Sequence, residues 1–173
     1  MTRPRYPVTP AIRFLRAKRV DFKTFIYTYT DRGGARQAAR ELGVPEHWVV
    51  KTLVMETGDQ LPLLVLMHGD QAVSTRKLAR VIDTKKVLPV RPDKALNHTG
   101  YQVGGISPFG VRQPMPVYVQ TTILELKTIY INGGKRGFIV AVDPIVLLDT
   151  LSAVPVPIAA LSRGPGSVKP GCP

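Results

Sequence analysis

The sequence predicts an α+β domain in which helices pack on a mixed or antiparallel β-sheet. Segments rich in aromatic and β-branched residues are interspersed with segments that carry helix-capping residues, and two hairpin signals join neighbouring strands. The 173 residues, 44% of them hydrophobic, are enough for one domain with a buried core. We therefore expect a single domain over residues 1–154 and a Pro/Gly-rich C-terminal tail over residues 155–173.

The first half of the chain alternates helix and strand signals. Thr9 and Pro10 provide an N-cap and a proline at the first helical position, which predict a helix that continues to Val20. A second helix over residues 35–42 is closed by Gly43 in the C-cap position. Strands are expected over residues 22–29, 48–57 and 61–68, and a helix capped by Ser74 and ending at Ile82 follows.

The second half is predicted to contain strands, one long loop and a final helix. The strands are expected over residues 85–90, 116–120, 128–132 and 138–142. Residues 92–97 suit a helical turn, whereas the many glycines and prolines of residues 99–116 favour a loop. Asn132 and Gly133 predict a type I′ hairpin turn, and a last helix is expected to start at Asp143-Pro144. The segment from Pro155 onward has no clear packing pattern.

Charge and residue content restrict the possible functions. A net charge of +12 favours a polyanionic partner such as nucleic acid, although a basic surface can also simply keep a protein soluble. The only cysteine, Cys172, excludes an internal disulfide and indicates a reducing, cytoplasmic setting. The three histidines are too scattered in sequence to suggest a metal motif. We also expect no signal peptide and no membrane-spanning helix.

Lys51 stands out because it lies inside an otherwise apolar strand. Strand alternation places Lys51 on the same face as Val49, Leu53 and Met55. One interpretation is that the side chain extends along the apolar surface to reach water at an edge. The other is that it lines a cavity in which an anionic or carbonyl partner offsets the cost of desolvation.

Two glycine-rich segments are candidate ligand-binding elements. In residues 99–110 four glycines allow close backbone approach, so that amide groups could hold a phosphate or a developing oxyanion. Residues 132–137, Asn-Gly-Gly-Lys-Arg-Gly, form a basic hairpin tip that could contact RNA phosphates but lack the spacing of a P-loop. A structural loop and a solvated turn are the alternatives that the patterns leave open.

Together and in order, these features resemble the bacterial YbaK-type deacylases, relatives of the editing domain inserted in bacterial prolyl-tRNA synthetases. The resemblance covers most of residues 9–151. Its best stretches are Thr9-Pro10-Ala11, Val50-Lys51-Thr52-Leu53, Thr99-Gly100-Tyr101 with Gly104-Gly105-Ile106-Ser107-Pro108, and Thr128-Ile129-Tyr130 with Gly133-Gly134-Lys135-Arg136-Gly137.

The resemblance implies a mixed, barrel-like β-sheet surrounded by helices, and an activity that deacylates mischarged Cys-tRNA(Pro). The resemblance also implies that no metal and no cofactor is needed, and that prolyl-tRNA synthetase is the protein partner. The implied catalytic residues are Lys51, Gly104 and Tyr27, with Lys51 as an anchor for the tRNA 3′ end and the substrate thiol as nucleophile. The implied substrate-binding residues are Thr52, Gly105, Ile106, Ser107, Pro108, Asn132, Gly133, Gly134 and Arg136.

Two positions depart from the family pattern and leave the aminoacyl preference open. Ile139 stands where the family commonly carries an aspartate, and Asn132 where a serine is frequent. Both changes would alter the polarity of the pocket. Deacylation of Ala-tRNA(Pro) is therefore an alternative activity, and a non-catalytic tRNA-binding module of the same fold is an alternative of a different class.

Overall fold

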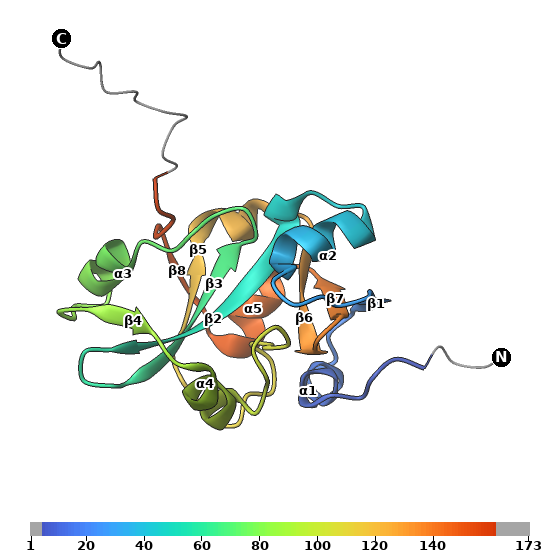
Figure 1. Ribbon diagram of the computed structural model, residues 1–173, viewed down its shortest axis with the longest axis horizontal. Coiled ribbons are helices and arrows are strands. Elements are labelled where there is room, and N and C mark those ends of the chain that lie inside the picture. Colours follow the sequence, from blue (N-terminus) through green and yellow to red (C-terminus); the bar gives the residue numbers. More distant parts are fainter. Residues whose placement is uncertain (1–4, 162–173) are drawn as a thin grey trace, which may run out of the picture.

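The computed structural model describes residues 5–161 and shows an α+β fold built on one mixed sheet of eight strands, which confirms the predicted class (Figure 1). The sheet order is β1-β7-β6-β2-β3-β5-β8, with β4 paired to β2 outside this path. The strand bounds are β1 Lys23–Ile26, β2 Val49–Thr57, β3 Pro62–His68, β4 Val87–Pro89, β5 Val117–Gln120, β6 Ile129–Lys135, β7 Phe138–Val142 and β8 Val154–Val156.

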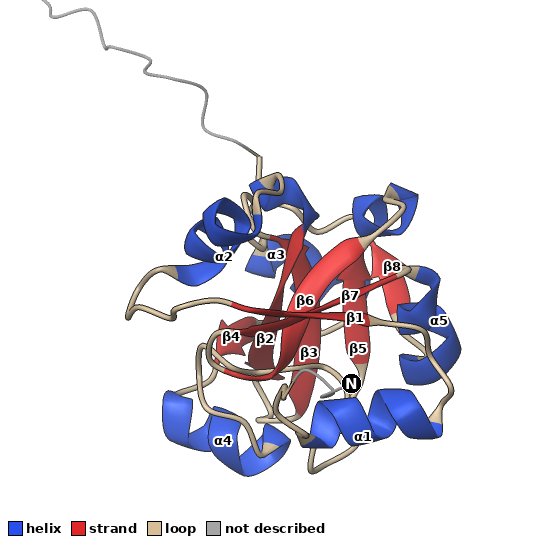
Figure 2. Ribbon diagram, turned by 90° about the vertical axis from the view of Figure 1, so that its right-hand side faces the viewer, coloured by secondary structure: helices blue, strands red, loops and turns tan. Residues whose placement is uncertain are grey.

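Helices cover both faces of this sheet (Figure 2). Their bounds are α1 Pro10–Ala17, α2 Gly34–Leu42, α3 Thr75–Val81, α4 Pro92–Thr99 and α5 Ile145–Leu151. The largest buried cluster joins α1 and α5 to the strands through Ile12, Leu15 and Leu147, and a second cluster lies under Leu78 of α3. In the part of the chain that the structure describes, no helix is long and apolar enough to cross a membrane.

The strand β3 shows how the two faces divide. Leu64 and Leu66 belong to the cluster under α1, whereas Leu63, Val65 and Met67 belong to the cluster under α3. The alternation of side chains along a strand produces this division, and burial on both faces explains why β3 reads as a continuous apolar run. The centre of the sheet is therefore packed on both faces.

Strand β2 has an interrupted edge. It pairs along its length with β3 on one side, but on the other side it pairs with β6 only at Val49 and Val50, and with β4 only from Met55 to Thr57. On that edge residues 51–53 pair with no strand among the described residues, and the carbonyl of Val54 accepts from the amide of Val90. This gap between β6 and β4 is where the cavity described below lies.

The hairpin between β6 and β7 forms, but its turn is not where the sequence predicts it. Lys135 pairs with Phe138, so the two-residue turn is Arg136-Gly137, and the register shifts between Asn132 and Lys135. Gly137 has a φ of 75°, which the turn requires and which glycine adopts without strain. Asn132 and Gly133 therefore lie in a bulge within the hairpin, and the predicted type I′ turn at these residues is wrong.

Ordered structure continues past residue 154. Residues 154–156 form β8, which pairs in parallel with β5, and Ile158 is fully buried against the cluster under α3. The backbone amides of Ile158 and Ala159 both donate to Oε1 of Gln120. The sequence shows no packing pattern from Pro155 onward, but residues 155–159 nevertheless pack against the sheet. Cys172 and the rest of the expected tail from residue 162 lie outside the described residues.

Candidate active site

A cavity of about 630 Å³ lies beside the unpaired edge of β2. Most of its wall is apolar, and the apolar lining includes Val49, Val50, Leu53, Val54, Met55, Ala95, Ile106 and Ile139. Its polar lining side chains are Tyr27, Tyr29, Arg32, Lys51, Thr52 and Asn132. A mostly apolar cavity with a few polar groups and two cations is the usual form of a small-ligand site.

Lys51 lines this cavity, as the second interpretation of the sequence requires. Its Nζ donates to the backbone oxygen of Gln71 at 2.5 Å, in the segment that follows β3. Partial burial lowers the pKa of the Lys51 ammonium, while the nearby carboxylates of Glu46 and Asp70 act in the opposite direction. The carbonyl partner therefore orients a cation that is partly stripped of water.

The segment that holds Lys51 is itself fixed by two histidines, His47 and His68, that lie far apart in the sequence. The rings of His47 and His68 stack with their centroids 3.6 Å apart. Nδ1 of His68 donates to the backbone oxygen of His47, and Nδ1 of His47 lies 2.9 Å from Oδ1 of Asp70. Among the residues from 5 to 161, no group of three or more His, Cys, Asp or Glu side chains could hold a metal ion.

His68 should make the stability of the fold depend on pH. Its side chain is fully buried, and this burial lowers its pKa, so the folded protein keeps it neutral with Nε2 accepting from Thr122. The unfolded chain binds a proton below about pH 6.5, the ordinary histidine value, and therefore binds more protons than the folded chain. We expect the free energy of unfolding to fall as pH is lowered below about 6.5, by at most about 1.4 kcal/mol per pH unit from this group.

Urea denaturation of the wild type and of His68→Asn at pH 7.5 and pH 5.5 measures this effect. The decrease in the free energy of unfolding between pH 7.5 and pH 5.5 should be smaller in His68→Asn than in the wild type, whatever the stability of the variant at pH 7.5. His98→Asn is the matched control, since His98 is partly exposed and contacts Oε1 of Gln113 at the surface. An equal loss in the wild type and in His68→Asn would contradict the assignment.

The glycine-rich loop reaches the cavity at Val103 and Gly104 and is clamped there by the hairpin. Nδ2 of Asn132 donates to the backbone oxygen of Gly104 at 3.1 Å, and Nε of Arg136 donates to that of Val103 at 2.9 Å. Oδ1 of Asn132 in turn accepts from the backbone amide of Gly134 at 2.7 Å. The hairpin thus holds two successive carbonyls of the loop, that of Gly104 through the Asn132 amide and that of Val103 through the Arg136 guanidinium.

Gly104 occupies a position that only glycine suits. Its φ is 90°, and a Cβ at this residue would lie 2.7 Å from the Tyr29 hydroxyl. The amide of Gly105 donates to the oxygen of Gln102, which closes a turn around Val103 and Gly104. Within residues 5–161 the amides of Val103 and Gly104, two residues that line the cavity, donate to no acceptor in the protein.

Tyr27 and Thr52 complete the polar lining. Burial raises the pKa of the Tyr27 phenol, with Tyr29 and Glu41 acting in the same direction, so the hydroxyl is neutral at physiological pH. Oγ1 of Thr52 is buried and has no hydrogen-bond partner among the described residues. An unsatisfied buried hydroxyl in a cavity wall is a group that a bound ligand can satisfy.

The structure separates the predicted site residues into two groups. Lys51, Gly104, Tyr27, Thr52, Ile106 and Asn132 line the cavity, together with Ile139, the residue that departs from the family pattern. The others do not line it: Gly105, Ser107, Pro108, Gly133, Gly134 and Arg136. Several of these have packing roles instead: a Cβ on Gly105 would lie 2.8 Å from the amide nitrogen of Arg136, and Oγ of Ser107 accepts from the amide of Phe109.

Sequence reasoning missed two polar residues of the wall. Arg32 is the second cation of the cavity, and it follows the expected strand in a turn with a φ of 64°. Tyr29 packs under the Arg136 guanidinium, 5.1 Å from the ring centroid, and against Gly104. Tyr29 lies two residues after Tyr27 in the expected strand. This spacing, which places both rings on one face of a strand, is the sequence signal that could have identified Tyr29.

With this geometry established, the chain can be placed among known proteins. It belongs to the aminoacyl-tRNA editing domain family, which matches residues 32–150. A proposed Cys-tRNA(Pro)/Cys-tRNA(Cys) deacylase of Enterococcus faecalis, EbsC, is 28% identical over 142 residues, which cover 82% of this chain and 87% of EbsC. Within the family the chain is a YbaK-type editing domain.

Relatives also occur inside a larger enzyme. The proline–tRNA ligase of Lactobacillus gasseri is 27% identical over 100 residues, which are 58% of this chain but only 18% of the ligase. Among solved structures, hypothetical protein APE2540 superposes with a TM-score of 0.80 at 22% identity, covering 87% of this chain and 99% of that one. A proposed trans-editing enzyme for prolyl tRNA synthetase gives 0.74 at 20% identity, covering 90% and 100%. These two structures share the fold.

Proposed function

We propose that this protein hydrolyses the aminoacyl ester of mischarged tRNA(Pro), with cysteine as the preferred aminoacyl group. The observation that carries the proposal is the placement of Lys51 and the free amides of the 102–105 turn on one apolar cavity, in a chain of the aminoacyl-tRNA editing family. Free amides suit an oxyanion and a fixed cation suits the ribose or phosphate of the 3′ end. The name of EbsC supports the choice of cysteinyl ester.

The cavity favours a nucleophile that the substrate brings with it. Among the described residues that line it there is no Asp, Glu or His that could activate a water molecule. A cysteinyl ester can react without such a base, because its own thiol attacks the carbonyl carbon. The ester bond to the ribose then breaks, the ribose oxygen takes the thiol proton, and water opens the resulting thiolactone to free cysteine.

In this mechanism each protein group has a defined role. The amides of Val103 and Gly104 stabilise the charge that develops on the carbonyl oxygen, and Lys51 anchors the terminal adenosine or its phosphate. Tyr27 and Thr52 offer hydroxyls to the substrate's polar groups. The apolar wall around Ile139 accepts a small side chain such as that of cysteine, and it leaves the alanyl ester as the nearest competitor.

The synthetase that produces the mischarged tRNA is the proposed protein partner. The likeness to a segment of a proline–tRNA ligase supports this, since the same domain occurs there in the polypeptide that makes the error. The alternative, a tRNA-binding module without turnover, predicts affinity for tRNA and no ester hydrolysis.

Three substrates distinguish these possibilities: Cys-tRNA(Pro), Ala-tRNA(Pro) and Cys-tRNA(Cys). We expect the purified protein to release cysteine from Cys-tRNA(Pro) faster than alanine from Ala-tRNA(Pro). The rates of cysteine release from Cys-tRNA(Pro) and Cys-tRNA(Cys) show whether the protein distinguishes the two tRNAs. Faster release of alanine would reject the proposed aminoacyl preference. Hydrolysis of none of the three substrates would reject the proposed activity in favour of the non-catalytic tRNA-binding module.

A further inference from the structure

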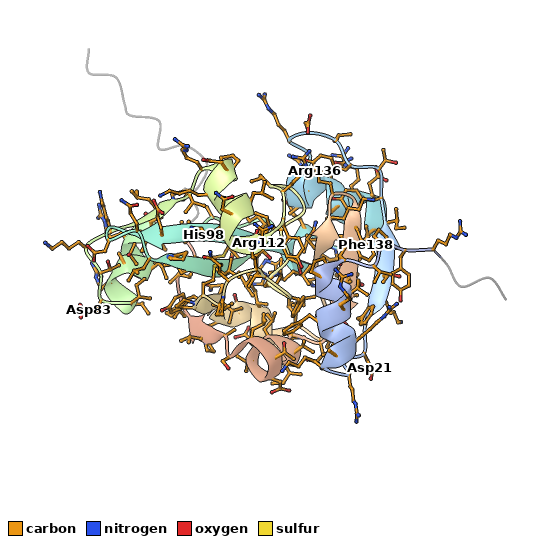
Figure 3. All side chains as sticks on the ribbon, turned by 90° about the horizontal axis from the view of Figure 1, so that it is seen from below. Asp21, Asp83, His98, Arg112, Arg136 and Phe138 are labelled. Carbon is orange, nitrogen blue, oxygen red and sulfur yellow. The ribbon has the colours of Figure 1, made fainter. Side chains whose placement is uncertain are left out.

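A second hollow, of about 550 Å³, opens beside the candidate active site, and we call it the basic hollow. The residues that matter for its chemistry are Arg5, Tyr6, Ile26, Tyr27, Lys135 and Arg136. They come from the segment before α1, from the edge strand β1 and its extension, and from the β6–β7 hairpin. Figure 3 shows Arg136 and Phe138 at this end of the molecule, far from Asp83 beside α3.

The basic hollow combines uncompensated positive charge with aromatic rings. Arg5, Lys135 and Arg136 are exposed, and none of them forms a salt bridge with another residue in the range 5–161. No acidic residue lines the hollow among the described side chains. Basic side chains interleaved with aromatic rings are the arrangement that binds single-stranded nucleic acid, through its phosphates and its bases.

One of the aromatic rings is held rigidly in place. Tyr6 stacks on Phe138 with ring centroids 6.1 Å apart, and its hydroxyl accepts from Nη2 of Arg16 at 2.9 Å. Near it, Ile26 is 65% exposed on the outermost strand of the sheet. The Arg16 guanidinium lies over the same ring, 5.7 Å from its centroid. Tyr6, Arg16 and the exposed Ile26 together therefore form a surface against which a base can stack at little cost in side-chain entropy.

Two residues connect the hollow to the active-site cavity. Tyr27 lines both, and it is held at the hairpin by its amide, which donates to the oxygen of Gly137 at 2.9 Å. Arg136 lines the hollow, while its Nε donates to the oxygen of Val103 in the cavity wall. A chain-like ligand whose end occupies the cavity can therefore continue past Tyr27 into the hollow.

We propose that the basic hollow binds the nucleotide that precedes the terminal adenosine of the acylated tRNA, with its phosphate near Lys135 and Arg136 and its base against Tyr6 and Ile26. This rests on the proposed function, because it takes the aminoacyl adenosine to occupy the cavity. It assigns to the 3′ end a binding site made of residues that do not touch the ester.

Two hydrolysis-resistant probes test the assignment: cysteinyl-adenosine, and a cysteinyl trinucleotide with the same terminal adenosine, both with an amide in place of the ester. The double variant Arg5→Glu/Lys135→Glu changes two exposed side chains of the hollow. Arg80→Glu/Lys85→Glu is the matched control, with two exposed cations at the α3–β4 end of the molecule and the same change of net charge.

The trinucleotide should bind the wild type more tightly than the adenosine probe does. We expect the hollow variant to lose about tenfold or more of its affinity for the trinucleotide, with a shallower dependence of affinity on salt. Its affinity for cysteinyl-adenosine should stay within about twofold. The control, which carries the same change of net charge as the hollow variant, should bind both probes as the wild type does. A thermal unfolding midpoint near that of the wild type establishes that the variant is folded.

Equal affinity of the wild type for both probes, or an unchanged trinucleotide affinity in the hollow variant, would overturn the proposal. So would a variant that keeps this affinity but loses binding to prolyl-tRNA synthetase, since the hollow would then be a protein-binding surface. Binding of the probes is measured separately from deacylation. A wild type that binds the trinucleotide through the hollow but releases no cysteine from tRNA would refute the proposed function alone.

Discussion

Replacement of Lys51 by alanine is expected to lower kcat/KM for the deacylation of Cys-tRNA(Pro) roughly 10- to 150-fold. Nζ of Lys51 is held at the cavity by the oxygen of Gln71 and, in the proposed function, hydrogen-bonds the 3′ end of the tRNA. A hydrogen bond to a charged group contributes about 1.5–3 kcal/mol, and each 1.4 kcal/mol corresponds to about a tenfold change in rate. Steady-state release of cysteine from Cys-tRNA(Pro) measures the loss.

Lys77→Ala is the matched control for Lys51→Ala. Nζ of Lys77 donates to the backbone oxygen of Ala159 at 3.0 Å, so this substitution also removes a partly buried lysine that contacts a carbonyl. Lys77 lies on α3 and does not line the cavity. Its loss should affect stability but leave kcat/KM within about twofold. Similar losses of activity in both variants would mean that Lys51 acts only through folding.

Gly104→Ala is expected to reduce kcat for the same reaction by about 100- to 1,000-fold, the effect of losing one donor to a developing oxyanion. The added Cβ would lie 2.7 Å from the hydroxyl of Tyr29, at a φ of 90° that alanine rarely adopts. The turn must move away from Tyr29, so the amides of Val103 and Gly104 no longer meet the carbonyl. Single-turnover deacylation with saturating enzyme separates this loss from weaker binding.

Gly100→Ala controls for backbone strain. Gly100 also has a positive φ, 80°, but a Cβ there would meet no atom closer than 3.7 Å, and the residue lies outside the cavity wall. Its replacement should cost about 1–2 kcal/mol in the free energy of unfolding, the cost of a left-handed conformation for an L-residue, and leave kcat unchanged. If Gly100→Ala reduced kcat as much as Gly104→Ala, strain in the loop rather than the amides would be the cause.

Much of the fold could be predicted because it follows from local patterns. The N-cap at Thr9 forms as expected, with Oγ1 accepting from the amide of Ile12. Along β2, Val50 and Val54 join one buried cluster and Met55 the other, as strand alternation predicts. Lys51 could be singled out for the same reason, since a charged residue conflicts with an apolar strand whatever the tertiary structure.

The remaining features depend on contacts between distant segments. Asn132-Gly133 has the composition of a tight turn, but the side chain of Asn132 clamps Gly104, and the chain turns four residues later at Arg136-Gly137. The stacked pair of His47 and His68 forms because Glu46–Trp48 packs beside the end of β3. The cavity itself exists because β6 and β4 leave a gap along β2, which no local pattern reveals.

The most direct test of the proposed activity is the rate at which purified protein releases cysteine from Cys-tRNA(Pro), compared with the rate in buffer. The proposed function predicts rapid release by the wild type, by Lys77→Ala and by Gly100→Ala, and greatly slowed release by Lys51→Ala and Gly104→Ala. Release no faster than in buffer by the folded wild type, or undiminished release by both cavity variants, would contradict the proposal that this cavity deacylates tRNA.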